Sequence, residues 1–196
     1  MKSSRPYVMR VRAEAAEATR QRILASARAL LLTHSFEQMT IESIAQGADT
    51  TARTVLRIFG DKEELFAQAL NSLEEFAQTP IVAGDLDALV GGTYEFYEKV
   101  GDTVIRWLAD EPRSAAMHAR LEVGRRHLRS WVGRAFAAAL NPLQDRARRE
   151  LHDALIVAFD VYTWKLLRRD FGLSRAAAQA RTKRLVMGLI GGDVNG

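Results

Sequence analysis

The side chains that commonly perform catalysis or hold metals are few and widely spaced in this chain. The sequence contains no cysteine, which excludes disulfides, thiolate zinc sites and thiol nucleophiles. None of its four histidines stands four residues from another, the spacing at which two imidazoles on one helix share a metal ion. Neither standard glycine-rich phosphate loop occurs. We therefore expect no enzyme, no metal site and no cofactor.

The basic side chains instead point to binding of a polyanion. Residues 1–62 contain ten Lys or Arg and six Asp or Glu, a difference of +4, whereas residues 63–196 contain eighteen of each. The whole net charge of +4 therefore lies in the first third of the chain. DNA is the natural partner for such a segment, and a basic segment that only keeps the protein in solution is the alternative.

Composition places the chain among ordinary globular proteins. Its 196 residues, 47% hydrophobic and 27% charged, are enough to bury a core as one large domain or as a small domain joined to a larger one. No apolar run approaches the roughly 18 residues that span a bilayer, and no apolar stretch follows the basic N-terminus. We expect a cytoplasmic protein without a membrane partner.

Apolar residues recur with helical spacing along the whole chain, and no strand-like alternation is sustained. In the first third this spacing predicts a helix over residues 19–33, a short helix that Thr40 caps, and a third helix from Thr51 to Phe59 that ends at Gly60. The acidic side chains after Asp61 predict the start of a fourth helix there. Longer helices are predicted beyond residue 80, approximately over 86–100, 102–110, 113–140, 143–171 and 174–191. The predicted fold is all-α, with about nine helices and no sheet.

Three short helices with a tight turn before the third describe a helix-turn-helix. Residues 19–27, with the sequence TRQRILASA, and the segment 40–65 resemble the DNA-binding head of the TetR (tetracycline-repressor-like) family. The positions that match the family signature are Ile44, Ala45, Ala48, Thr51, Thr54, Phe59, Lys62 and Leu65. The resemblance is strong over residues 19–70, and beyond them the chain matches only as an all-helical body.

Four positions depart from the family pattern. Ser35, Asp49 and Arg53 stand where the family usually has glycine, and Leu56 stands where it usually has tyrosine. Aspartate tolerates the left-handed backbone that a glycine in the turn would adopt. Leucine cannot make the phosphate contact of the usual tyrosine hydroxyl. Arg53 and Arg57, one helical turn apart, offer compensating charge, unless they merely solvate their helix.

The resemblance implies three regions: a basic N-terminal arm (1–18) with Arg5, Arg10 and Arg12, a helix-turn-helix domain (19–65), and a ligand-binding and dimerisation domain (66–196) of about six helices. The side chains expected to contact DNA are Thr40, Thr51, Ala52, Arg53, Thr54, Arg57 and Lys62. Arg53 is the best candidate for reading a guanine edge, and either Ala52 or Thr54 for touching a thymine methyl. Thr40 lies near a phosphate in this scheme, and Lys62 resembles the family's phosphate-contacting lysine.

Two further sets of residues are predicted in the body. The last two long helices carry apolar stripes that either pair with a second copy, as the family implies, or pack within the chain; they include Leu151, Leu155, Ala158, Phe159, Tyr162, Leu166, Leu185, Val186, Leu189 and Ile190. Mixed aromatic and polar residues between positions 94 and 136 either line an effector pocket or form core; they include Tyr94, Tyr97, Trp107, Met117, His118, Leu121 and Trp131.

The sequence therefore predicts a DNA-binding transcription regulator. The resemblance implies a homodimeric repressor that a small-molecule effector, not identified by the sequence, releases from a double-stranded DNA operator. The alternative is a helical ligand-binding or scaffold protein whose degenerate head does not bind DNA.

Overall fold

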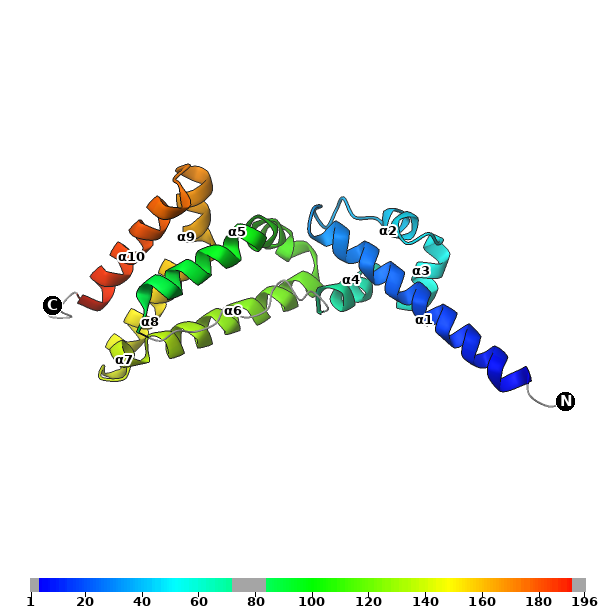
Figure 1. Cartoon of the computed structure of the whole chain (residues 1–196), viewed down its shortest axis with the longest axis horizontal. Helices are drawn as coiled ribbons and strands as arrows, with labels where there is room; N and C mark the ends of the chain where they lie inside the picture. The colour runs from blue at the N-terminus through cyan, green and yellow to red at the C-terminus, as the bar shows by residue number, and fades with distance from the viewer. Residues whose placement is uncertain (1–3, 72–83, 192–196) are drawn as a thin grey trace. The chain divides into compact units, whose positions relative to one another are not determined.

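The computed structural model describes residues 4–71 and 84–191, with side chains from residue 10 onward in these ranges. Its elements are helices: α1 (Ser4–Leu31), α2 (Ile41–Gly47), α3 (Ala52–Phe59), α4 (Lys62–Asn71), α5 (Leu86–Asp110), α6 (Ala115–Ala135), α7 (Ala137–Leu140), α8 (Asp145–Phe159), α9 (Val161–Lys165) and α10 (Arg175–Gly191) (Figure 1). A 3-10 turn, η2 (Glu111–Arg113), follows α5, and a π-helical turn, η3 (Leu166–Asp170), follows α9. The all-α prediction is confirmed, because no strand occurs in the described ranges.

The chain folds as two compact units. The head unit contains the described residues up to 71 together with residues 107–121, and the body unit contains residues 84–106 and 122–191. The head unit thus includes a segment, 107–121, that lies outside the helix-turn-helix domain predicted from the sequence.

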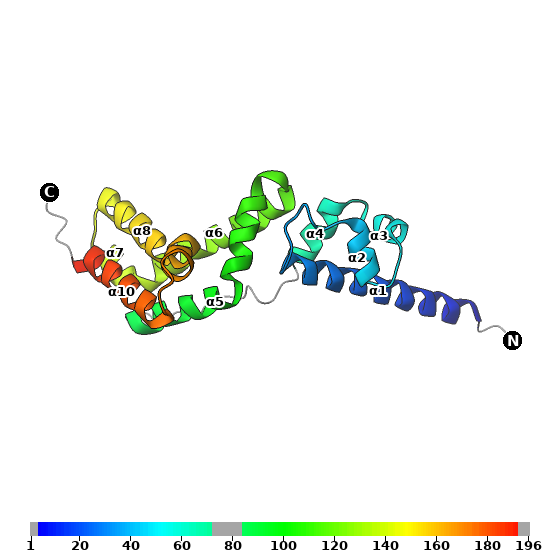
Figure 2. The ribbon, with the colours of Figure 1, turned by 90° about the horizontal axis from the view of Figure 1, so that it is seen from above.

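In the head unit, α1 packs against both α2 and α4, and α3 packs against α2 and α4. Figures 1 and 2 show α2 and α3 lying next to each other beside α1. Of the apolar side chains that the helical spacing predicts to face inward, Ile23, Leu24, Ala27, Ile44, Val55 and Phe59 are buried where these helices meet. The prediction was wrong for Leu56, which was expected to face inward with Val55 and Phe59 and is exposed. The helix-turn-helix therefore has its own small core.

The first helix is longer than predicted. Residues 4–18, expected as a separate arm, form the beginning of α1, although the side chain of Arg5 lies outside the described part. The stretch around residues 11–20 is rich in Ala, Glu and Arg, which have high intrinsic helix propensity. An ion pair from Arg10 to Glu14 at 3.4 Å adds the i, i+4 support typical of a solvated helix.

Three predicted helix boundaries in the body were wrong. The helices predicted over 86–100 and 102–110 are one helix, α5, which runs through Gly101. The helix predicted over 113–140 ends at Ala135, and α7 follows separately. The helix predicted over 143–171 breaks at Asp160, whose extended backbone (ψ 153°) and side chain start α9 by accepting a hydrogen bond from the Tyr162 amide at 2.9 Å.

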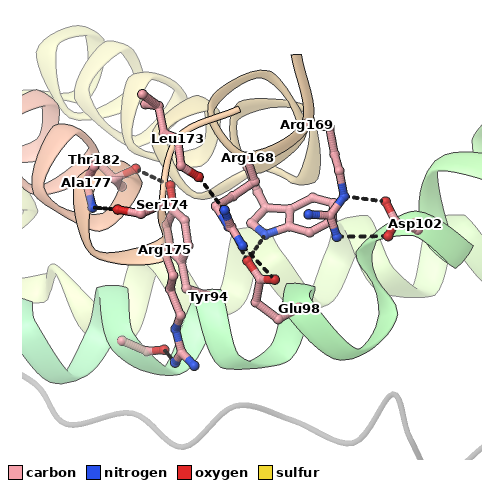
Figure 3. Close-up of polar contacts among 12 residues, drawn as sticks. Tyr94, Glu98, Asp102, Arg168, Arg169, Leu173, Ser174, Arg175, Ala177 and Thr182 are labelled. Atoms are coloured by element: carbon pink, nitrogen blue, oxygen red, sulfur yellow. Dashed lines mark hydrogen bonds and ion pairs between the residues drawn. The ribbon is translucent and has the colours of Figure 1, made fainter. Parts of the chain in front are cut away.

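A ladder of polar side chains joins α5 to the segment η3–α10 in the body unit (Figure 3). Arg168 donates to both carboxylate oxygens of Glu98 and to the Leu173 carbonyl, and Arg169 donates to both oxygens of Asp102 at 2.8 and 2.9 Å. These hydrogen bonds from Arg168 and Arg169 hold the pKa values of Glu98 and Asp102 below their ordinary ranges. Further along, the Tyr94 hydroxyl lies 2.9 Å from that of Thr182.

The indole ring of Trp164 contacts two side chains of this ladder, those of Glu98 and Arg169. It donates from Nε1 to Glu98 at 3.2 Å and carries the Arg169 guanidinium 4.5 Å from its centroid. A Cβ atom at Gly101 would fall on the ring, so the close approach of α5 to α9 depends on that glycine. Gly101 therefore serves the packing of α5 on Trp164 and does not mark the end of a helix.

No helix in the described ranges is long and apolar enough to cross a membrane. Among the same residues, no group of three or more His, Asp or Glu side chains is placed to hold a metal ion.

Candidate nucleic-acid interface

Two threonines begin the helices of the helix-turn-helix, as the sequence predicted. The Thr40 hydroxyl accepts from the Ser43 amide at 3.0 Å, and the Ser43 hydroxyl accepts from the Thr40 amide at 3.1 Å, forming a capping box. The Thr51 hydroxyl accepts from the Thr54 amide at 3.2 Å and lies 3.0 Å from the Thr54 hydroxyl. The three hydroxyls of Thr40, Thr51 and Thr54 thus already have partners within the head.

The turn between α2 and α3 uses a left-handed residue. Asp49 has a φ of 50°, the conformation for which the family's glycine is suited and which aspartate tolerates. The Thr50 amide donates back to the Ala45 carbonyl at 3.0 Å and closes the turn. Asp49 therefore preserves the turn geometry despite departing from the usual residue.

Helix α3 divides sharply into an inner and an outer face. Val55 and Phe59 are buried, whereas Arg53, Leu56 and Arg57 are exposed. These three positions are i, i+3 and i+4 and therefore share one side of the helix. Neither guanidinium forms a hydrogen bond or ion pair with the described part of the chain. The outer face of α3 thus presents two available cations one helical turn apart, together with one exposed apolar side chain.

Helix α1 holds this outer face in place through side chains that were not predicted as part of the site. Arg22 donates from Nε to the Ala48 carbonyl in the turn at 3.2 Å, and the Arg20 guanidinium lies 4.8 Å from the centroid of the Phe59 ring. Ser26 donates to the Ile44 carbonyl at 2.9 Å, and its hydroxyl fills the space where Gly47 lacks a Cβ. In the sequence, Arg20 and Arg22 belong to the basic excess and to the segment 19–27 that resembles the family's head, but no role was predicted for either side chain.

Lys62, which resembles the family's phosphate-contacting lysine, is half-buried and bound within the head unit. Its ammonium donates to the Phe36 carbonyl at 2.6 Å and lies 4.0 Å from the centroid of the Phe36 ring. Desolvation by this partial burial lowers the pKa of Lys62, although nearby Glu63, Asp110 and Glu37 oppose the shift. The side chain therefore ties the start of α4 to the loop between α1 and α2.

The same loop is held from its other side by the segment 107–121. The buried Asp110 carboxylate accepts from the Phe36 amide at 2.8 Å, so both polar groups of Phe36 are bound by side chains from distant parts of the chain. Trp107 donates to the Leu31 carbonyl at 3.0 Å, and Glu63 accepts from the Ser114 hydroxyl at 2.9 Å. These contacts fix the loop that leads into the helix-turn-helix.

Comparison with known proteins agrees with this geometry. Residues 23–69, from the middle of α1 to α4, match the family model of bacterial regulatory proteins, tetR family. The chain carries a tetR-family DNA-binding domain. The match covers 47 of the 196 residues and nearly all of the segment over which the sequence resembles this family. No curated protein sequence matches the chain.

In a helix-turn-helix that binds DNA, the second helix of the motif enters the major groove, and α3 is the second helix here. Of the seven residues predicted to contact DNA, Arg53 and Arg57 are exposed on the outer face of α3 and Thr51 is exposed at its start. Ala52 and Thr54 are half-buried, Thr40 is exposed at the start of α2, and Lys62 is turned inward.

The seven residues predicted to line an effector pocket fall into both units. Trp107, Met117, His118 and Leu121 belong to the head unit, and Tyr94, Tyr97 and Trp131 belong to the body unit. All are buried except His118, which is exposed and lies 2.9 Å from Glu111. Tyr97 donates to the Phe159 carbonyl at 3.1 Å, while burial raises the pKa of its hydroxyl.

The residues predicted to form a dimer interface differ in their exposure. Leu155, Ala158 and Phe159 are buried within the described part of the single chain, and Leu151 and Leu189 are half-buried. Tyr162 and Leu185 are exposed. Tyr162 was predicted on the same helix as the buried residues of α8, but α8 ends before Asp160 and Tyr162 belongs to α9.

Proposed function

We propose that the protein is a homodimeric repressor that binds a double-stranded operator through α3 and is released from it by a small-molecule effector. The observation that carries the DNA-binding step is the outer face of α3, where Arg53 and Arg57 are exposed and have no hydrogen-bond or ion-pair partner among the described residues. Guanidinium groups recognise guanine edges and phosphates, and a helix of this motif brings them into the major groove.

A titration of the full chain with DNA selected from a randomised pool tests this step. We expect tight binding whose affinity falls steeply with salt, because bound cations displace counterions from the phosphates. Arg53→Ala combined with Arg57→Ala should abolish selective binding. The matched control, Arg126→Ala with Arg129→Ala, removes the same charge from exposed positions of α6 in the body unit and should leave binding intact.

The alternative, a helical ligand-binding or scaffold protein, makes the opposite prediction. Such a protein would enrich no sequence from the pool, and the two double variants would behave alike.

Dimerisation is supported by exposed apolar side chains on the last helices of the body unit. Helix α8 packs against α10. These two helices, α9, η3 and the residue directly after η3 expose large apolar side chains that the described part leaves uncovered: Val157, Tyr162, Leu166, Phe171, Leu185, Met187 and Ile190. Apolar surface of this kind is typical of a protein–protein interface. A second copy also suits a helix-turn-helix, since paired half-sites strengthen a weak single contact.

Release by an effector is supported by Trp131. Its indole is buried, packs against Phe159 with ring centroids 5.1 Å apart, and has no hydrogen-bond partner for Nε1 among the described residues. A buried donor without a partner is costly, and a ligand acceptor would satisfy it. We expect an effector with an aromatic body and a hydrogen-bond acceptor to quench tryptophan fluorescence in the wild type. The quenching should be reduced in Trp131→Phe, and the same compound should weaken DNA binding only in the wild type.

A further inference from the structure

Leu56 is an unusual side chain for the place it occupies. It is 44% exposed on the outer side of α3, three residues after the exposed Arg53 and directly before the exposed Arg57 in the chain. Within the described residues of the head unit, the other exposed large apolar side chain is Val11, far away on α1. An apolar side chain flanked by two cations does not suit an apolar protein partner, which would leave both charges buried without partners.

The partner that fits is an anionic surface carrying isolated methyl groups. The major groove of DNA has this chemistry, because every thymine projects a 5-methyl group among the acceptors of the bases. We propose that Leu56 packs against the 5-methyl group of a thymine in the operator and makes that thymine a determinant of the site. This inference rests on the proposed function and assigns a specificity-determining contact within it.

The spacing along α3 gives the position of the thymine. Arg53 and Leu56 are three residues apart, which is about 4.5 Å along a helix axis. Successive base pairs are about 3.4 Å apart. If Arg53 binds a guanine, the thymine read by Leu56 lies one or two base pairs from it. Arg57 follows at the last turn of α3, where it is placed for a backbone phosphate.

Uracil substitution tests the contact directly, because deoxyuridine differs from thymidine only by the missing methyl. The best duplex selected by the wild-type chain is synthesised with each thymine replaced by uracil in turn. At one or two positions in each half-site we expect the affinity of the wild type to fall about three- to tenfold, because Leu56 no longer has a methyl group to pack against. Uracil at the remaining positions should have no effect.

Two variants assign the effect to Leu56. Leu56→Ala should bind the thymine duplex about as weakly as the wild type binds the uracil duplex, and uracil at the sensitive position should weaken it no further. Leu56→Tyr should bind many duplexes more tightly through a new phosphate hydrogen bond and should also lose the uracil effect. Val123→Ala removes a comparably exposed aliphatic side chain from α6 in the body unit and should behave as the wild type.

The inference is overturned if the wild type selects a duplex but no uracil weakens binding, or if Leu56→Ala keeps the same uracil sensitivity. A wild type that selects no duplex overturns the proposed function itself and the inference with it. Because Leu56 is exposed, we expect all three variants to keep the circular dichroism spectrum of the wild type.

Discussion

At the scale of single residues, the structure separates side chains that face outward from side chains that hold the head together. Arg53 and Arg57 face outward, whereas Arg20, Arg22 and Lys62 are engaged with other parts of the head unit. The basic excess of the first 62 residues is therefore not one surface. Part of it is exposed for the DNA contact that we propose, and part of it holds α3 in position.

Arg53→Ala should weaken operator binding by roughly 1–3 kcal/mol and relax the preference for one base pair. The reason is that a guanidinium bonds both acceptors of a guanine edge, and alanine leaves them without this partner. Binding titrations against duplexes varied at each position measure both effects. Unchanged affinity and unchanged base preference would remove Arg53 from the set of reading residues.

Lys62→Met should lower the stability of the head unit by about 1–3 kcal/mol, because the ammonium no longer binds the Phe36 carbonyl. The slope of DNA affinity against salt should stay unchanged, whereas Arg57→Ala should reduce it by about one. Urea titration and salt-dependent binding separate these outcomes. A reduced salt slope with unchanged stability would restore the phosphate contact that the family resemblance implies for Lys62.

At the scale of helices, sequence periodicity predicted the number and type of elements in the head almost completely. Caps at Thr40 and Thr51 and the glycine after Phe59 are local signals, and each of them marks a boundary in the structure. The body was less predictable because its boundaries depend on distant partners. The sequence predicted a helix break near Gly101, but this glycine lies inside α5 and makes room for the Trp164 ring. It predicted a continuous helix through Asp160, but the backbone of Asp160 is extended and separates α8 from α9.

The same limit applies to the candidate site. The exposed residues of α3 follow from its amphipathic pattern, so Arg53 and Arg57 were predictable. The inward turn of Lys62 was not, because it depends on the Phe36 carbonyl in a loop 26 residues earlier. Leu56 stands out in the sequence as a departure from the family pattern, but the helical spacing predicted that it faces inward, and its exposure is seen only in the structure.

Gly101→Ala should destabilise the body unit by about 1–3 kcal/mol, since the added methyl overlaps the Trp164 ring. Gly91→Ala is the control on the same helix, because nothing lies within 4 Å of a Cβ there. It should be neutral or stabilise the unit by about 0.5–1 kcal/mol through reduced backbone freedom. Urea denaturation followed by tryptophan fluorescence compares the two. Equal effects would contradict the close packing of α5 on Trp164.

The polar ladder between α5 and η3 should make the body unit sensitive to acid. The pKa values of Glu98 and Asp102 are lowered by Arg168 and Arg169, so their contribution to stability is present above the ordinary values of 4.5 and 3.8. It is lost as the pH falls through the lowered values. We expect the urea midpoint to fall over this range in the wild type and to fall less in Glu98→Gln.

Glu95→Gln is the control for this acid dependence. Glu95 is paired with Lys99 at 2.9 Å on the same helix, but this ion pair is solvent-exposed. Its removal should leave the acid dependence of the wild type nearly unchanged. An identical acid profile for Glu98→Gln and the wild type would show that the ladder contributes nothing to acid sensitivity.

At the scale of the whole molecule, the proposed dimer determines whether the exposed apolar side chains of α8 to α10 are covered. Leu185 is 52% exposed on α10 next to the buried Val186. Leu185→Glu should convert a dimer to a monomer at micromolar concentration, because a buried carboxylate without a partner is costly. Sedimentation measures the mass. Val123→Glu, on an exposed position of α6, should remain a dimer, and a monomeric wild type would exclude the proposed assembly.

The side-chain bonds to Phe36 also affect how fast its amide hydrogen exchanges with solvent. Its amide hydrogen is held by the Asp110 carboxylate, 74 residues away, and not by a neighbouring backbone carbonyl. Exchange of that hydrogen with solvent deuterium therefore requires separation of the α1–α2 loop from the segment 107–121, because no helix of its own protects it. The exchange rate of this amide therefore reports how often the loop separates from the segment 107–121. A slower rate in the presence of operator DNA would show that DNA binding suppresses this motion.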